Sequence, residues 1–317
     1  MAIVYAAPYI PTAPPQLWRG LGMTWTGWDG SLWDLTKVEG GAVLMAGVRG
    51  LSMPPVQHIT TTYSSVHGAR WRGNTVETRE VFWPIQIFSD AGSEAWVLRE
   101  RAFWKTMRPK KTGIWTVTLP DGQQRYLECR FADDSQQAFN LDPVAVGWNN
   151  YGINMVAHQP FWCGPNIRRE WGGGGVESPF FPDDTRRTFA ISPSNGFTDA
   201  RVSNPGDMDV WPIWEVYGPC SSAHVGVNGQ TITVPFPIDA GKVLIIDTSP
   251  TAQTAIQYDY TGAGVTRVLT NPVDKIAQLG QTEFYPIPPE DPVSVDLVMD
   301  GEGHLAVEFT PHYLRAW

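Results

Sequence analysis

The 317-residue sequence has few of the residues that build disulfide frameworks and metal centres. It contains 3 cysteines, Cys129, Cys163 and Cys220, an odd number that is too widely spaced for a CxxC pair. Its 6 histidines never occur in an HxH, HxxE or HExxH arrangement. We therefore expect buried, reduced thiols, no metal site and no cofactor.

Long apolar runs are also missing. No window approaches the roughly 18 uninterrupted apolar residues that a membrane-spanning helix needs. Residues 1–15 have neither the basic start nor the apolar stretch of a signal peptide. The sequence therefore predicts a protein that is neither exported by a signal peptide nor inserted in a membrane.

The usual signatures of catalysis are absent as well. There is no Gly-x-Ser-x-Gly motif of a nucleophile elbow. The glycine run at residues 172–175 is not followed by the Gly-Lys-Ser/Thr of a phosphate loop, so we interpret it as a flexible connector. Adjacent carboxylates at 133–134, 183–184 and 290–291 all lie in loop-like stretches, where acids normally face solvent. These observations predict no catalytic residues and a protein that is not an enzyme.

Tryptophan and an uneven distribution of charge are what the sequence does have. The 15 tryptophans and 42% hydrophobic content are typical of a folded protein with large rigid side chains to bury or present. Residues 1–165 carry 14 basic and 13 acidic side chains, whereas residues 206–317 carry 4 basic and 14 acidic ones. Nucleic acid and other anionic polymers would repel a C-terminal third that is so acidic. Neutral sugars and proteins are the classes of partner that this charge still allows.

Alternation of apolar and polar residues predicts strands along most of the chain. In the first part these strands cover residues 32–35, 43–48, 58–63, 76–88, 113–119, 124–131 and 144–158. In the second part they cover residues 211–217, 224–227, 231–234, 243–247, 255–260, 293–298 and 304–309. Because no helical pattern interrupts the second set, its seven strands predict a β-sandwich.

Turn and linker residues divide these strands into domains. Asp121-Gly122 between two alternating runs predicts a tight hairpin, since this dipeptide supplies the positive backbone angles of the turn. Between about residues 165 and 206 the composition shifts to Gly, Pro, Ser and Asp, which is typical of a linker or a long loop. We therefore expect a first domain at 1–165, a linker or arm at 166–186 and a second domain at 187–317.

One helix is predicted in the first domain, from about Ser93 to residue 107. Trp96 and Phe103 fall at helical spacing, and Leu98 widens the apolar stripe. Ser93 is suited to cap the start of the helix, and the proline at 109 ends it. A single helix beside many strands makes the first domain mainly β.

Positive charge gathers in the middle of the first domain, interleaved with tryptophans. A nucleic-acid groove is one interpretation. We favour an interface between subunits, because the domain as a whole is near neutral and because Arg and Trp are frequent anchors of protein contacts. The candidate interface residues are Arg70, Trp71, Arg72, Arg79, Arg99, Arg101, Trp104 and Arg108.

Aromatic residues of the second domain form a separate candidate contact. Tyr258 and Tyr260 share one strand face near a Gly-rich turn, where they could meet a peripheral partner or a sugar. Trp211 and Phe236 lie in or beside strands and are expected to be buried. Sugar binding by this domain is a hypothesis that depends on its fold class and its aromatics alone.

The order of several segments resembles the distal tail proteins, or minor tail proteins, of siphophages that infect actinobacteria. The first set is GMTWTGWDGSLWDL at 22–35 with GVRG at 47–50. The second is GAR at 68–70 with RE at 79–80, the helix, RP at 108–109 and PDGQQR at 120–125. The third is NPGD at 204–207, WPI at 211–213, VLIIDT at 243–248 and EFTPHY at 308–313.

The resemblance implies a structural role in the virion. A ring-forming, sandwich-like belt domain with one helix would build a six-fold ring at the tail tip, stacked on the tail tube, and a galectin-like or carbohydrate-module-like sandwich would hang outside. The implied partners are other copies of the chain, the tail tube protein, the tail-tip hub and tape-measure proteins, and fibre or receptor-binding proteins. Assembly would take place in the host cytoplasm, without sequence-specific binding to nucleic acid.

Two other classes of function stay open at this point. A carbohydrate-binding adhesin that contacts the host surface would be favoured by exposed aromatics in a shallow groove on residues 206–317. A glycan-cleaving enzyme with an appended sandwich has the weakest support, because no acid/base pair stands out.

Overall fold

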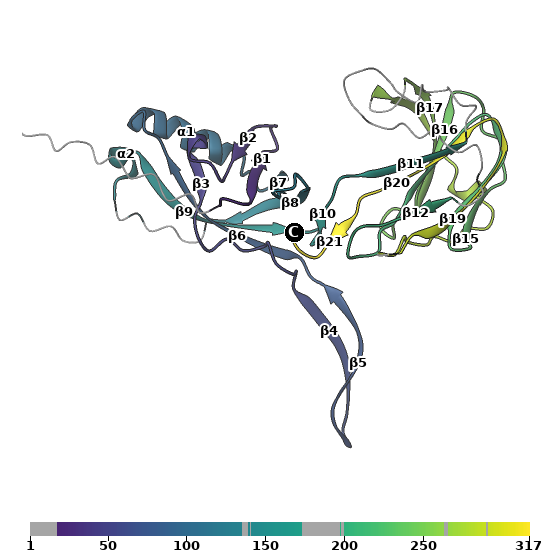
Figure 1. Ribbon diagram of the computed structural model, residues 1–317, viewed down its shortest axis with the longest axis horizontal. Coiled ribbons are helices and arrows are strands. Elements are labelled where there is room, and N and C mark those ends of the chain that lie inside the picture. The colour runs from purple at the N-terminus through teal and green to yellow at the C-terminus, as the bar shows by residue number, and fades with distance from the viewer. Residues whose placement is uncertain are drawn as a thin grey trace, which may run out of the picture. The chain divides into compact units, whose positions relative to one another are not determined.

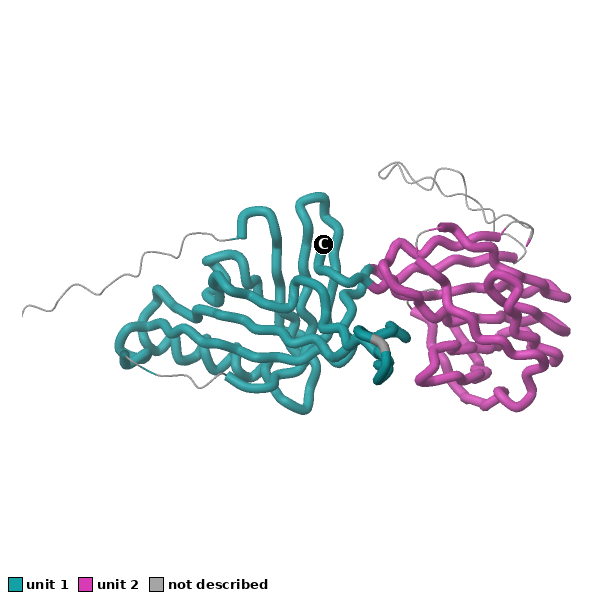
Figure 2. The backbone as a smooth tube through the Cα atoms, turned by 90° about the horizontal axis from the view of Figure 1, so that it is seen from below, with its two compact units in different colours: residues 1–164, 313–317 teal, residues 165–312 magenta. Residues whose placement is uncertain are grey.

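The computed structural model describes residues 18–134, 139, 141–172, 197, 200–262, 266–289 and 291–317. The chain forms two compact units (Figure 2). The first contains residues 1–164 and the closing residues 313–317, and the second contains residues 165–312. Among the described residues no helix is long and apolar enough to span a membrane.

A nearly closed, barrel-like sheet forms the first unit. Its strands run in the order β2-β1-β7-β8-β9-β6-β3. They are β1 (Gly22–Thr26), β2 (Leu32–Asp34), β3 (Ala42–Leu44), β6 (Arg79–Phe88), β7 (Gly113–Thr118), β8 (Gln124–Asp133) and β9 (Trp148–Ala157). The two ends of this order meet, because the amide of Leu44 in β3 donates to the carbonyl of Leu35, directly after β2, at 2.8 Å. The short β10 (Trp162–Cys163) pairs with β8 and with β21 (His312–Tyr313).

A row of tryptophans fills this barrel. Trp25, Trp83, Trp115 and Trp162 are all buried, and each ring meets the next edge-on, with centroids 5.0–5.3 Å apart. Alternation explains their placement, since every second residue of a strand points to the same face. Such pairs are worth about 1 kcal/mol each beyond the area they bury. The core is therefore rigid and leaves the outward residues of the strands for contacts.

The helix forms where the sequence predicts it, as α1 (Ser93–Lys105), and buries Trp96 and Phe103. Two details of the prediction are wrong. Gly92 is the N-cap and no side chain caps the helix, because Ser93 is already inside the first turn. Leu98 lies outside the buried stripe and is exposed.

Other short helical elements accompany these strands. A short helix, α2 (Pro143–Val146), replaces the predicted start of the strand at 144–158, because Asp142 caps it through the Val144 amide. A 3-10 turn, η1 (Val38–Gly40), precedes β3. The expectation of a mainly β protein with few helices is confirmed.

The Asp-Gly hairpin is confirmed as well. β7 and β8 pair from Gly113 opposite Cys129 to Thr118 opposite Gln124. The turn closes through the Gly122 amide, which donates to the Leu119 carbonyl at 3.0 Å. Gly122 has φ 88°, the left-handed conformation that favours glycine.

A second hairpin projects from the first unit as an arm (Figure 1). It consists of β4 (Val56–Tyr63) and β5 (Val66–Val76), which pair only with each other in the sheets formed by the described residues. The sequence predicted β4 but not β5. Strand β5 escaped prediction because glycine or arginine at positions 68, 70, 72 and 73 interrupts any apolar alternation along it.

Two antiparallel sheets that share one core form the second unit. The first has the order β11-β20-β13-β16-β17-β18 and the second the order β12-β19-β14-β15. The larger sheet consists of β11 (Ile167–Gly172), β20 (His304–Phe309), β13 (Ile213–Tyr217), β16 (Lys242–Asp247), β17 (Thr254–Thr261) and β18 (Val268–Asp274). The smaller consists of β12 (Arg201–Val202), β19 (Val293–Gly301), β14 (Cys220–Val227) and β15 (Gln230–Val234). A 3-10 turn, η3 (Ile276–Gln278), follows β18.

All seven strands predicted for the second part have counterparts here, and β11, β12 and β18 were not predicted. Strand β11 lies inside the stretch 166–186 that was expected to be a linker or arm. Its residues 167–172 instead form a regular strand, which pairs in register with β20. Residues 173–186 of that stretch lie outside the described residues. Strand β11 thus begins close to the boundary between the two units.

Candidate assembly surfaces

The arm carries a group of exposed aromatic and aliphatic side chains together with positive charge. Trp71 is 60% exposed, Ile59 50% and Tyr63 49%. No Asp or Glu occurs between residues 56 and 76, whereas Arg70 and Arg72 lie there. Exposed apolar and cationic groups on one projecting element indicate a surface that contacts another macromolecule.

The arm has two distinct faces. Arg72 donates to the Thr61 hydroxyl at 3.2 Å and to the Tyr63 hydroxyl at 3.1 Å. Arg70 stands opposite Thr61 in the register, so it belongs to this same basic face. On the other face the Trp71 indole donates to Nδ1 of His58 at 3.2 Å. Both faces are open, because no second layer of the described residues pairs with the hairpin or covers it (Figure 1).

Arg79 lies inside the first unit, which corrects its place among the predicted interface residues. It is 1% exposed. Its guanidinium donates to four carbonyl oxygens, those of Pro160, Gly50, Ser52 and Leu314. Burial lowers the pKa of Arg79 to about 10, so the group is still charged at neutral pH. Arg79 therefore holds residues 313–317 against the barrel through hydrogen bonds, and its side chain is too buried to contact another subunit.

The candidate residues of α1 have mixed placements. Arg99 is half-buried and donates to the Phe88 carbonyl at 2.6 Å. Trp104 is half-buried too, with its ring edge-on to Phe131 and Tyr151. Arg101 is exposed. Arg99 and Trp104 therefore serve the packing of the helix on the barrel, whereas Arg101 points to solvent.

Arg108 is exposed and stacks on Trp28, a residue that the sequence did not single out. The guanidinium carbon lies 4.6 Å from the centre of the indole, and Nζ of Lys111 lies 5.7 Å from it. The Trp28 indole donates to the Lys105 carbonyl at 2.9 Å, which fixes the ring at the end of α1. Such cation–π contacts are worth roughly 0.5–1 kcal/mol at an exposed site. Little in the sequence indicated these contacts, because Trp28 lies about 80 residues before Arg108 and Lys111 in the chain.

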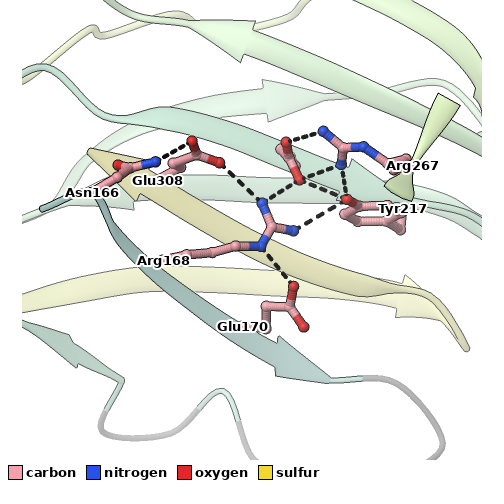
Figure 3. A network of polar contacts seen from close by, with 7 residues as sticks. Asn166, Arg168, Glu170, Tyr217, Arg267 and Glu308 are labelled. Atoms are coloured by element: carbon pink, nitrogen blue, oxygen red, sulfur yellow. Dashed lines mark hydrogen bonds and ion pairs between the residues drawn. The ribbon is translucent and has the colours of Figure 1, made fainter. Parts of the chain in front are cut away.

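A polar network covers the outer face of the larger sheet in the second unit (Figure 3). At its centre is Glu215, whose side chain is 3% exposed. Arg267 grips it through two hydrogen bonds of 2.8 Å, and Nη1 of Arg168 lies 2.7 Å from its Oε2. The Tyr217 hydroxyl donates to the same carboxylate at 2.6 Å. The sequence analysis missed this network, because its charges come from three strands or loops that are distant in the chain.

The network fixes the charge of Glu215. Burial alone would raise the pKa of Glu215, but the hydrogen bonds from Arg267, Tyr217 and Arg168 outweigh it and lower the pKa to about 2. Burial and the neighbouring Glu215 raise the pKa of Tyr217 to about 12. All these groups are satisfied by one another, so the arrangement binds the strands of the sheet together and offers no general acid or base.

Tyr258 and Tyr260 lie on this same sheet and are half-buried. They pack against a small cluster that contains Tyr217 and Val243. The Tyr260 ring is edge-on to Tyr217, with centroids 5.2 Å apart. Their packing assigns them a structural task within the sheet, and their predicted contact with a peripheral partner or a sugar is untested.

In the described residues, the side chains that commonly bind metals do not gather into a cluster. No group of three or more His, Cys, Asp or Glu side chains that could hold a metal ion occurs among them. All three cysteines are free, and burial raises the pKa of the Cys129 thiol. What the geometry supplies instead is surface for contacts, above all the arm.

The barrel-like first unit and the two-sheet second unit have counterparts among solved structures of phage proteins. The chain matches the Dit protein of phage SPP1 with a TM-score of 0.61 over 93% of this chain and 99% of that one, at 14% identity. It matches a chain of the activated baseplate of phage P2 with a TM-score of 0.50 over 91% and 97%, at 12% identity. At these identities the likeness establishes the fold.

A likeness in sequence points the same way. The chain is 27% identical over 139 residues to the minor tail protein Gp27 of Mycobacterium phage D29. The match covers 43% of this chain and 41% of that protein, so it spans about two fifths of the relative's length. No family model matches the chain. The resemblance to phage distal tail and minor tail proteins, predicted from the sequence, is confirmed, and the proteins found are structural components of phage tails.

Proposed function

We propose that this protein is a distal tail protein, a non-enzymatic hub that forms a hexameric ring at the tip of a phage tail and becomes part of the virion. The proposal extends to this chain what is described for the SPP1 Dit protein, a hub of the adsorption apparatus in phages that infect Gram-positive bacteria. The first unit would build the ring as a belt domain. The second, a galectin-like sandwich, would face the periphery.

The observation that carries the ring is the arm. An isolated two-stranded hairpin is marginally stable in water, because it has no second layer on which to bury a face. Here both faces are open, and Trp71 is 60% exposed. A hairpin with this composition gains stability when another surface covers it. Another copy of the chain is the partner that is always present at equal concentration.

A ring also requires that each copy use two different surfaces. Head-to-tail contacts close into a ring when the rotation between neighbours is right, whereas a self-complementary patch gives only a dimer. The arm and the body of the first unit are different surfaces of one subunit. This asymmetry allows the head-to-tail contacts that a closed ring needs.

The remaining partners follow from the place of the ring. One face would contact the tail tube protein, and the other the tail-tip hub and tape-measure proteins. The periphery would hold fibre or receptor-binding proteins. The acidic second units, with 14 acidic against 4 basic residues in 206–317, would repel one another and stay separate around the rim. Assembly in the host cytoplasm is consistent with the free thiols.

Removal of the arm tests the ring directly. Val56 and Val76 stand opposite each other at the base of the hairpin, so an Asn-Gly turn can replace residues 57–75 and close the two strand ends. We expect the full-length protein to form a six-membered ring in native mass spectrometry and the armless variant to be a folded monomer. The physical reason is the loss of the large unpaired surface that each arm contributes.

The matched control exchanges Ser64-Ser65 at the tip of the arm for Asn-Gly, which changes the turn and leaves both strands in place. This variant is expected to form rings as the parent does. An armless variant that still forms rings would refute the role of the arm. A parent chain that stays monomeric at every concentration tested would refute ring formation by the chain alone.

A further inference from the structure

A groove lies on the outer surface of the barrel, directly beside the base of the arm. It has a volume of about 370 Å³. Its walls come from β6, β8, β9 and the segment before the arm, and the residues that matter here are Arg49, Glu80, Phe82, Asp133 and Asn154. The guanidinium of Arg49 lies 5.7 Å from the centre of the Phe82 ring, and Asn154 donates to Asp133 at 2.6 Å. The groove thus offers one aromatic ring between charged walls.

The chemistry of this groove complements the basic face of the arm. That face presents two guanidinium groups, of Arg70 and Arg72, beside the exposed Ile59 and Tyr63. The groove presents two exposed carboxylates, of Glu80 and of Asp133, and Asp133 already accepts from Asn154. An arginine fork and a carboxylate form a strong charge-assisted contact when a neighbouring surface excludes water from it.

The arm cannot reach the groove of its own chain. Strand β5 ends at Val76, and Thr78 and Glu80 of the groove follow within four residues. Arg72 and Arg70 lie four and six residues before Val76, so the extended strand carries them roughly 13–20 Å away from the groove at its base. To fold back, the hairpin would have to break the pairing of β4 with β5. Only the groove of a different copy is accessible to it.

We infer that the arm of one subunit docks, through its basic face, in the groove at the base of the arm on the next subunit. This inference rests on the proposed ring and names the surfaces that join its members. Each copy then gives an arm on one side and receives one on the other. Glu80 accepts from the arginines of the incoming arm, and Phe82 packs against its apolar side chains.

Charge reversal on each side tests this contact in the intact chain. The variants are Arg70→Glu with Arg72→Glu on the arm, Glu80→Arg in the groove, and the combination of all three. Mass photometry over a dilution series gives the concentration at which half of the rings dissociate. We expect this concentration to rise at least tenfold for the arm variant and for the groove variant, and to return to within about threefold of the parent in the combination.

Two further variants make the outcome interpretable. Glu39→Arg places the same charge change at another exposed site of the first unit and is expected to leave the rings unchanged. Glu80→Gln removes the charge without adding one and is expected to give a smaller effect than Glu80→Arg, which guards against a misfolded variant. Near-ultraviolet circular dichroism checks that the tryptophan core is intact.

The outcomes separate the two proposals. If Glu80→Arg assembles as the parent does while the arm variant does not, the arm docks elsewhere, and the inference fails while the ring stands. If the rings of the combined variant dissociate at a concentration as high as that of the weaker of the arm and groove variants, the inference fails too. If the parent forms no rings, the proposed function fails, and the inference falls with it.

Discussion

Arg79→Ala is expected to lower the free energy of unfolding of the first unit by about 4 kcal/mol, because it removes the buried donor that four carbonyl oxygens share. These carbonyls belong to Gly50, Ser52, Pro160 and Leu314, which come from three separate parts of the chain. The Gly50 carbonyl keeps a second donor, the Trp162 indole at 3.2 Å, but the guanidinium is the group that joins these three parts of the chain. Urea unfolding followed by tryptophan fluorescence measures the loss, since four buried tryptophans form the core of this unit.

A local measurement distinguishes the hold of Arg79 on residues 313–317 from a general loss of stability. The Ala316 amide donates to the Leu51 carbonyl at 2.9 Å, and hydrogen exchange at this amide reports whether the closing residues stay docked. We expect exchange there to accelerate in Arg79→Ala before the barrel strands are affected. Unchanged exchange at residues 313–317 together with an unchanged unfolding midpoint would contradict the assigned role.

Two other arginine variants serve as controls. Arg79→Lys keeps the charge but cannot direct donors to four carbonyls at once, so a loss of about 2 kcal/mol is expected. Arg101→Ala removes an exposed arginine of α1 and is expected to stay within about 0.5 kcal/mol of the parent. An equal loss for Arg101→Ala would show that arginine removal in general, and not the hold of Arg79 on residues 313–317, causes the effect.

The sequence predicted the elements whose pattern reflects burial on one face. Strands β7 and β8 and the turn between them followed from alternation and from Asp-Gly, and α1 followed from the spacing of Trp96 and Phe103. Strand β5 could not be found in this way, because neither face of the arm is buried in the chain. The absence of apolar alternation in β5 fits the place of this strand in an exposed hairpin, and such a hairpin is a candidate for contact with another subunit.

Buried charge was beyond the reach of sequence reasoning. Arg79 looked like a surface arginine, because the carbonyls that hold it come from residues distant in the chain. Glu215 sits in an otherwise apolar run, Ile213–Tyr217, and its partners Arg168 and Arg267 lie on other segments. A charge within a strand that is otherwise apolar is the one signal available, and it predicts burial without naming the partner.

Glu215→Gln is expected to lower the free energy of unfolding of the second unit by about 3 kcal/mol at pH 7. The change leaves Arg168 and Arg267 side by side without the carboxylate between them. Hydrogen exchange in a urea series measures the effect on β13 and β16 separately from the first unit. Glu308→Gln is the matched control: it removes a carboxylate of the same network whose side chain is 32% exposed, and at most about 1 kcal/mol is expected.

The stabilisation by Glu215 also has a defined dependence on pH. The pKa of this carboxyl is about 2 in the folded protein, against 4.5 as its ordinary value. A carboxyl with a lowered pKa stabilises the fold at pH values above its ordinary pKa, and this contribution is lost as the pH falls toward the folded value. The difference between the parent and Glu215→Gln should therefore be constant from pH 7 to about 5 and shrink between about 4.5 and 2. A difference that stays constant down to pH 2.5 would mean that the hydrogen bonds of the side chain, and not its charge, stabilise the sheet.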